Sequence, residues 1–153
     1  MYQRIFVPVD GSSTSRRGLD EAIAIAKSTQ GRLHLLHVVD DLPIVTEAVE
    51  GFTTSGTDIM GMVTDEGKDI LAEAQAYVQQ AGLNCDVTMR RTSKAKIYEQ
   101  ILQVALEWKA DLIVLGTHGR TGAERLFMGS DAEQVVRHTD LPVLLVRQKD
   151  GEE

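Results

Sequence analysis

Four residues in the C-terminal part of the sequence have the types and the spacing of an anion-binding loop. Gly116 and Gly119 are separated by two residues, and nine further residues lead to Gly129 and Ser130. A glycine has no Cβ, so an anionic group can approach its backbone N–H closely. Gly129 and Ser130 open a predicted helix, whose first N–H groups and positive dipole end also attract anions. Two such patches on one loop predict a polyphosphate site, where Ser130 offers both its hydroxyl and its N–H.

Three more side chains belong to this loop. Thr117, His118 and Arg120 stand beside or between the two glycines. The Arg120 guanidinium could pair with a phosphate or be solvated at the surface, and both interpretations stay open. His118 has no nucleophile near it in the sequence, so solvation explains it better than catalysis. We predict that all three side chains line the phosphate loop.

Asp10 directly follows the first apolar run of the sequence, and its carboxylate has two candidate roles. It could cap N–H groups of the following loop or helix start. It could also accept a hydrogen bond from an adenine amino group or a ribose hydroxyl. Because a carboxylate repels phosphate, we place Asp10 at the nucleoside end of a ligand or near a metal ion. Pro8 and Val9, just before it, would provide apolar walls.

The elements that must position these residues alternate along the chain. Short apolar runs predict strands, and apolar residues at helical spacing predict helices. The predicted strands are Ile5–Val9, Leu33–Val39, Asn84–Arg91, Leu112–Leu115 and Val143–Val146, and the predicted helices are Ser15–Gln30, a segment around Leu71 to Gly82, Ile97–Trp108 and Ser130–His138.

Strands that are separated by helices pair in parallel, with right-handed crossovers. Near-continuous apolar strands are buried on both faces. We therefore predict an α/β fold: a single doubly wound, five-stranded parallel sheet with the strand order 3-2-1-4-5 and helices on both faces. Ligands bind such sheets at the carboxyl ends of the strands, where the order reverses. Asp10 follows the first strand and Gly116 follows the fourth, so their loops should converge on one crevice.

The segment from Asp40 to about Asp65 is different. It contains Gly51, Gly56 and Gly61 and shows weak periodicity. We predict a long connection here, which would be a functional lid or a partly disordered segment.

His34 and His37 are three residues apart on the second predicted strand. This spacing places their side chains on opposite faces of the sheet and disfavours a shared metal site. We expect both to be packed and hydrogen-bonded.

The composition excludes several classes of protein. The 153 residues suit one domain, and the net charge of -7 argues against nucleic acid or an anionic membrane as the main partner. Cys85 is the only cysteine, so no internal disulfide is expected, and it should be a buried apolar residue. We find neither a signal peptide nor an apolar run of the ~20 residues that span a bilayer, and we expect a cytoplasmic protein.

The spacing G-x2-G-x9-G-[S/T] resembles that of the ATP-binding branch of the universal stress protein family. VPVDGS at 7–12, LLHVVD at 35–40 and LPVLLVR at 141–147 also resemble motifs of this family and follow its order, whereas the P-loop and Rossmann patterns are absent. The resemblance covers nearly the whole chain. It implies a universal stress protein domain over residues 1–147, a short polar tail at 148–153, and a Rossmann-like fold related to the adenine nucleotide alpha hydrolases.

The same resemblance implies roles for particular residues. Asp10 and a backbone position that maps to Val38 would hold the adenine of ATP, which would bind together with Mg²⁺. Family members commonly pair the last strand with its symmetry mate, so a homodimer is expected through Val143 to Arg147.

Three hypotheses for function follow. The sequence has no GxSxG elbow, Cys–His pair or HExxH motif, so we assign no catalytic residue. We predict a nucleotide-responsive stress or signalling module that binds ATP without robust turnover. One alternative is a slow ATPase or phosphotransferase that uses the same site. Another is a dimeric partner-binding module with a vestigial site, or with a site for another adenine nucleotide such as AMP or cAMP.

Overall fold

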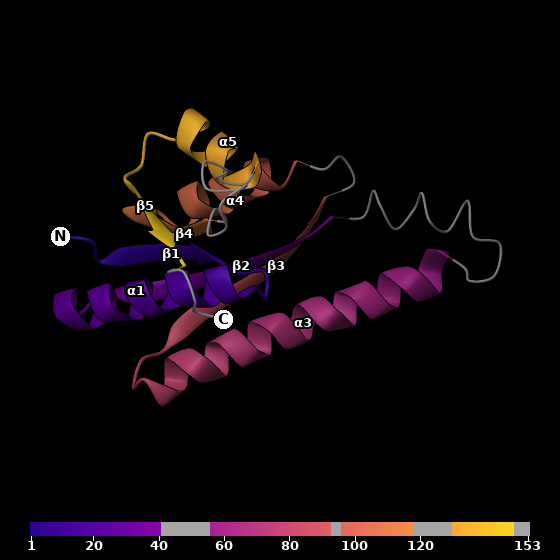
Figure 1. Ribbon diagram of the computed structural model, residues 1–153, viewed down its shortest axis with the longest axis horizontal. Helices are drawn as coiled ribbons and strands as arrows, with labels where there is room; N and C mark the ends of the chain where they lie inside the picture. The colour runs from indigo at the N-terminus through magenta and orange to yellow at the C-terminus, as the bar shows by residue number, and fades with distance from the viewer. Residues whose placement is uncertain (41–55, 93–95, 118–129, 149–153) are drawn as a thin grey trace.

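A computed structural model describes residues 1–40, 56–92, 96–117 and 130–148. Within these ranges the chain forms alternating strands and helices (Figure 1). In chain order they are β1 (Arg4–Pro8), α1 (Ser13–Thr29), β2 (Arg32–Asp40), α3 (Gly56–Gln80), β3 (Cys85–Thr92), α4 (Ile97–Glu107), β4 (Leu112–Thr117), α5 (Ser130–His138) and β5 (Val143–Arg147).

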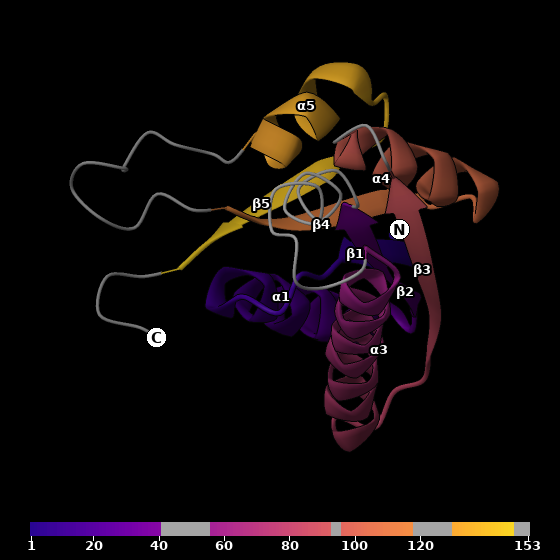
Figure 2. The ribbon, with the colours of Figure 1, turned by 90° about the vertical axis from the view of Figure 1, so that its right-hand side faces the viewer.

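The strands form one parallel sheet in the order β3-β2-β1-β4-β5. Helices α1 and α3 cover one face of the sheet, and α4 and α5 cover the other (Figures 1 and 2). The predicted doubly wound α/β fold is therefore confirmed, and so is the predicted strand order.

Helix α3 is longer than the sequence pattern predicted. It begins at Gly56, whereas we expected the connection to continue to about Asp65. Figure 1 shows the N-terminal part of α3 extending past the ends of β2 and β3. There is no sheet surface there to bury an apolar stripe: Met62 is 70% exposed, and a Cβ on Gly61 would meet nothing within 4 Å. The helical pattern is weak in this part because no described strand lies beneath it and favours an apolar stripe. The rest of the predicted connection, residues 41–55, lies outside the described residues.

Each face of the sheet has its own hydrophobic core. On β1, Ile5 and Val7 face α1 and α3, whereas Phe6 faces α4 and α5. All three side chains are fully buried. Burying a side chain of this size contributes about 1.5–3 kcal/mol. The central strand is therefore held firmly from both sides, and the loop that follows it starts from a fixed position.

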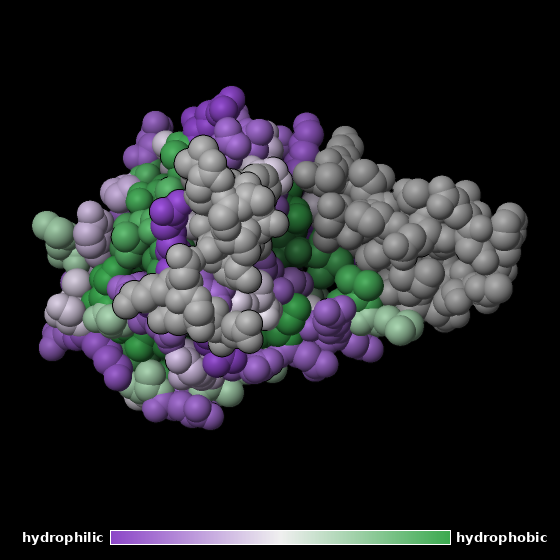
Figure 3. All heavy atoms as spheres, in the orientation of Figure 1, coloured by the Kyte–Doolittle hydropathy of each residue, from purple (hydrophilic) through white to green (hydrophobic). Residues whose placement is uncertain are grey.

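The surface of the molecule is mixed. Figure 3 shows hydrophilic residues along much of the outer rim, with hydrophobic residues gathered between the two helical layers. Among the helices that the structure describes, none is long and apolar enough to cross a membrane.

The two histidines of β2 lie on opposite faces of the sheet, as predicted. His34 packs between Phe6 and Trp108, and its Nε2 lies 2.8 Å from Thr88 Oγ1. His37 points to the other face, towards α3. Within the described ranges, no group of three or more His, Cys, Asp or Glu side chains could hold a metal ion.

Cys85 begins β3 and is half-buried, packed against the core on the α1 and α3 side. Burial raises the pKa of its thiol to about 11. The thiol is therefore protonated and unreactive at neutral pH, in line with the expected packing role.

His34 should make the protein less stable in acid. The residue is 7% exposed, its Nδ1 has no hydrogen-bond partner among the described residues, and burial lowers its pKa below the ordinary value of 6.5. The nearby Asp86 opposes this shift, and Arg4 adds to it. The unfolded chain therefore takes up a proton at a pH where the folded protein does not. Stability is complete above about pH 6.5 and is lost as the pH falls from there towards the lowered folded pKa.

Urea unfolding between pH 7.5 and pH 5 measures this effect. His34→Gln keeps a donor for Thr88 but cannot titrate, so its free energy of unfolding should fall less over this range than that of the wild type. His138→Gln replaces a histidine outside the core and is the control for losing any one histidine; it should not reproduce the smaller fall of His34→Gln. Equal slopes for the wild type and His34→Gln would contradict the assignment.

Candidate functional site

A crevice opens where β1 and β4 separate. These strands pair only at Ile5–Leu112 and Phe6–Ile113. Beyond these pairs, β1 continues along β2 and β4 continues along β5. Adjacent strands that connect in opposite directions leave such a gap at their carboxyl ends, which is where ligands bind in this class of fold.

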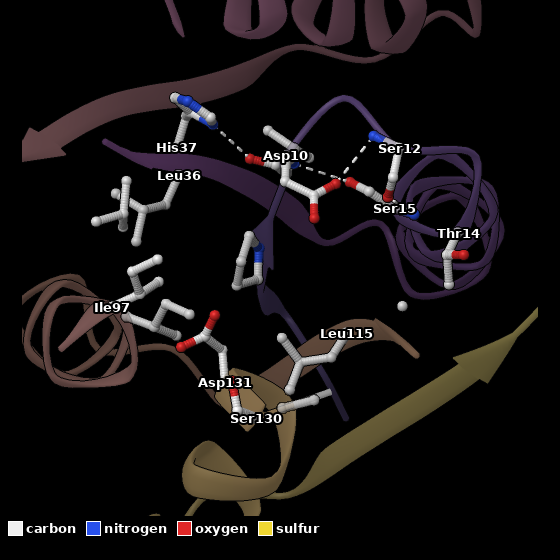
Figure 4. Close-up of a pocket in the computed structure, with 16 residues that line it drawn as sticks. Asp10, Ser12, Thr14, Ser15, Leu36, His37, Ile97, Leu115, Ser130 and Asp131 are labelled. Carbon is white, nitrogen blue, oxygen red and sulfur yellow. Dashed lines mark hydrogen bonds between the residues drawn. The ribbon is translucent and has the colours of Figure 1, made fainter. Parts of the chain in front are cut away.

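A cavity of about 320 Å³ occupies this crevice (Figure 4). Its size lies within the range of about 300–1,000 Å³ that is typical of small-molecule sites. The structure brings six of the predicted site residues to its walls: Pro8, Val9, Asp10, Val38, Gly116 and Ser130.

The other predicted site residues are not on the described walls. Thr117 is the last residue of β4 and is buried, and its hydroxyl makes a long hydrogen bond of 3.5 Å to the carbonyl of Val146. Its side chain therefore belongs to the β4–β5 pair and not to the cavity. The remaining predicted residues lie outside the described residues: His118, Gly119, Arg120 and Gly129.

Asp10 organises the turn between β1 and α1. Its Oδ1 accepts a hydrogen bond from the Ser12 N–H at 2.9 Å, and its own N–H donates to Ser15 Oγ at 3.2 Å. Ser12 is the N-cap of α1 and accepts from the Ser15 N–H at 3.1 Å. Asp10 therefore caps a backbone N–H at the start of α1, which is one of the two roles considered for it. In Figure 4 the second carboxylate oxygen of Asp10 faces the cavity, so capping leaves an acceptor available.

His37 joins the same turn to β2, and it was not among the predicted site residues. Its Nδ1 lies 2.8 Å from the carbonyl oxygen of Val9, which can only accept, so Nδ1 carries the proton. The Val9 N–H donates to the Leu36 carbonyl at 2.7 Å. A Cβ on Gly67 would lie 2.9 Å from His37 Cδ2, so α3 packs closely against the His37 ring at this glycine. The end of β1 is thus fixed from two directions.

Gly116 lies so close to α1 that a side chain would not fit. A Cβ at this position would overlap the carbonyl oxygen of Thr14 and lie 2.7 Å from its carbonyl carbon. A Cβ on Gly18 would in turn lie 3.2 Å from the Gly116 nitrogen. The missing side chain of Gly116 therefore admits the first turn of α1, and this contact places α1 against the end of β4.

One wall of the cavity, between Asp10 and the start of α5, is apolar. Its residues were not among the predicted site residues. Apolar residues from two strands and two helices line the cavity here. They are Leu36 from β2, Ile97 and Ile101 from α4, Leu115 from β4 and Ala132 from α5. A flat aromatic ring could pack against such a surface.

The start of α5 supplies the remaining polar groups. Ser130 is exposed, and Figure 4 shows it beside Asp131, whose carboxylate points into the cavity. Asp131 and Glu133 are acidic residues in the first turn, and Arg137 and His138 are basic residues in the last, an arrangement that complements the helix dipole. Among the described residues that line the cavity, Asp10 and Asp131 are the acidic ones, and no lysine or arginine is present.

Comparison with known proteins identifies the family. The sequence model of the universal stress protein family matches residues 1–147. The chain belongs to the universal stress protein family. Universal stress protein MJ0531 of Methanocaldococcus jannaschii is 34% identical over 148 residues, which cover 97% of this chain and 84% of that protein. The family that the sequence motifs predicted is therefore confirmed.

Solved structures of universal stress proteins share the fold. The protein MJ0577 of Methanocaldococcus jannaschii matches with a TM-score of 0.79 and 26% identity, over 99% of both chains. A universal stress protein solved in complex with cAMP matches with a TM-score of 0.61 and 27% identity, over 95% of this chain and 97% of that one.

Replacing Gly116 with alanine should destabilise this universal stress protein. The added Cβ would collide with the Thr14 carbonyl, which is backbone and cannot rotate away. We expect a loss of about 1–3 kcal/mol in the free energy of unfolding, the usual cost of overpacking. Chemical denaturation measures it. Gly61→Ala, on an open helical surface, is the matched control and should gain about 0.5–1 kcal/mol. A Gly116→Ala variant as stable as the wild type would refute this packing role.

Proposed function

We propose that this universal stress protein binds an adenine nucleotide, specifically ATP with Mg²⁺, in the cavity between β1 and β4. One observation carries the proposal: Asp10 and the start of α5 lie on opposite sides of a single cavity with an apolar wall between them (Figure 4). An acceptor for a nucleoside, a surface for a base and a helix N-terminus for phosphate are thereby brought together. The match to a universal stress protein that was solved with cAMP supports the adenine nucleotide class.

The proposed orientation follows from charge. The adenosine would lie at the Asp10 end, between Val9, Val38 and Ile97, where a carboxylate oxygen can accept from an amino or hydroxyl group. The phosphates would lie near Ser130, where the first N–H groups of α5 attract anions. The glycine-rich loop with His118, Gly119, Arg120 and Gly129 would enclose the phosphates.

The carboxylate oxygens on the cavity wall are suitable ligands for a Mg²⁺ ion that binds together with the nucleotide. Mg²⁺ prefers oxygen ligands and is usually held by one or two carboxylates together with phosphates and water. Asp131 lines the cavity at the start of α5, where the phosphates are proposed to lie, and the described residues offer no group of three that could hold a metal ion without the nucleotide. When bound, the ion would offset the charge of the triphosphate.

We further propose that the protein responds to the nucleotide without robust turnover. Asp10 and His37 lie at the β1 end of the cavity, where the nucleoside is proposed to bind, and not beside the proposed phosphates at the start of α5. Slow hydrolysis or phosphotransfer in the same site is the alternative. The protein would act as a cytoplasmic stress or signalling module, with residues 1–147 as the domain.

Substitutions at the two ends of the cavity should weaken binding in different ways. Asp10→Ala should weaken ATP, ADP and AMP by similar factors, because all three contain adenosine. Ser130→Ala should weaken ATP more than AMP, because its partner would be a distal phosphate oxygen. Each loss should be about 1–3 kcal/mol, or roughly five- to 150-fold in affinity. Calorimetric titration of three nucleotides into three folded proteins measures the pattern. Equal losses for every nucleotide in both variants would show that the orientation is wrong.

The protein should also form a homodimer through β5. This strand is an edge of the sheet, its backbone can pair with a second copy, and Leu145 on it is 37% exposed. Light scattering should give about twice the chain mass of 16.8 kDa. Leu145→Asp should give a folded monomer, whereas Val136→Asp, at a similarly exposed position on α5, should leave the dimer intact. A wild-type mass of one chain at micromolar concentration would rule the dimer out.

The end of β5 is tied to the site region. Gln148 follows β5 and is buried, and its Oε1 accepts hydrogen bonds from Ser13 Oγ at 2.9 Å and Thr14 Oγ1 at 3.4 Å. The sequence prediction assigned Gln148 to the polar tail, but this residue packs against α1. The proposed tail from 149 onward lies outside the described residues.

A further inference from the structure

We propose that His37 is a positioning residue for the nucleoside end of the cavity. It holds the peptide unit between Val9 and Asp10, and this peptide sets the direction in which Asp10 presents its carboxylate to the ligand. His37 therefore acts on the nucleotide through Asp10. The inference rests on the proposed function, because the ligand at this end is the adenosine of the proposed nucleotide.

The peptide between Val9 and Asp10 is held at both of its polar atoms. Its carbonyl oxygen lies 2.8 Å from His37 Nδ1, which donates to it, and its N–H donates to Ser15 Oγ at 3.2 Å. A trans peptide is planar, and its C=O and N–H point in opposite directions. One bond from β2 and one from α1 thus act on opposite sides of a single plane, and together they fix its rotation.

The orientation of this peptide determines where the Asp10 side chain can point. The peptide plane ends at the Asp10 Cα, from which the side chain departs. One carboxylate oxygen accepts from the Ser12 N–H at 2.9 Å, and Figure 4 shows the other facing the cavity. A rotation of the peptide would carry the side chain with it. Both the bond to Ser12 and the direction of the oxygen that faces the cavity therefore depend on the two bonds that hold the peptide.

The His37 ring is itself held in place. Its Nδ1 faces the Val9 carbonyl, and the opposite edge of the ring faces α3, where a Cβ on Gly67 would lie 2.9 Å from Cδ2 and 3.3 Å from Nε2. The Met89 sulfur, from β3, would lie 3.1 Å from the same Cβ. The ring thus packs between the end of β1 and α3, so the donor stays directed at the carbonyl.

Two replacements of His37 separate its donor from its bulk. Asparagine can place an amide N–H near the position of Nδ1–H, whereas leucine has a similar branched shape without a donor. His37→Leu should bind AMP, ADP and ATP more weakly by one common factor of roughly three to ten, the usual contribution of a neutral hydrogen bond. His37→Asn should remain within about twofold of the wild type. Calorimetric titration measures these dissociation constants.

A double-mutant cycle with Asp10 distinguishes positioning from a direct contact with the ligand. If His37 acts through Asp10, adding His37→Leu to Asp10→Ala should weaken AMP binding by no more than about twofold. Ser15→Ala releases the N–H of the same peptide and should show the same pattern, with a loss in the wild-type background and almost none beside Asp10→Ala. Should His37→Leu fail to fold, the cycle with Ser15→Ala still tests whether this peptide acts through Asp10.

His34→Gln is the matched control. It also removes a histidine from β2, but His34 lies on the opposite face of the sheet, is hydrogen-bonded to Thr88 and is not among the residues that line the cavity. Its dissociation constants for AMP, ADP and ATP should stay within about twofold of the wild type. Only variants that unfold cooperatively on heating enter the comparison.

The outcomes separate this inference from the proposed function. If the wild type binds no adenine nucleotide, the proposed function fails. If nucleotides bind but His37→Leu matches the wild type, or His37→Asn loses as much as His37→Leu, the role of the Nδ1 donor is refuted. If His37→Leu weakens AMP binding equally with and without the Asp10 carboxylate, His37 does not act through Asp10 and the inference is overturned.

Discussion

The contact between the first turn of α1 and the end of β4 constrains the rest of the structure. Gly116 has no side chain on the side where the Thr14 carbonyl lies, and Gly18 meets the Gly116 backbone one turn further along α1. This close approach brings the β1–α1 turn beside the end of β4. Because β1 and β4 cease to pair after Phe6 and Ile113, a cavity forms between the two strand ends instead of a continued ladder.

Hydrogen bonds hold the backbone on one side of this cavity. The end of β1 is held by the Leu36 carbonyl and by the His37 ring, and Asp10 holds the N–H of Ser12. These bonds fix the backbone before any ligand arrives, so binding would cost little ordering of this side. The start of α5 forms the other side, where Ser130 and Asp131 line the cavity.

Local patterns predicted the fold well because the three central strands, β1, β2 and β4, are buried on both faces. The apolar runs and the helical spacing gave the strand order, and the reversal of that order gave the crevice. The sequence pattern did not predict the start of α3. Residues there are not packed against the sheet, so they show no apolar stripe, and a Cβ on Gly61 would meet nothing within 4 Å. The patterns also missed Ile97 and Asp131, because the residue type does not reveal whether a packed or helix-starting residue also faces a cavity. Gly116 was placed at the site, but its contact with Thr14 depends on tertiary structure.

A crystal structure of the protein with ATP and Mg²⁺ tests the central claim most directly. The account predicts electron density for one nucleotide in the cavity between β1 and β4. Its adenine should lie against Val9, Val38 and Ile97, with an amino or hydroxyl group facing Asp10, and its phosphates should lie at Ser130 and the first turn of α5. A nucleotide bound elsewhere, or bound with its phosphates beside Asp10, would contradict the account.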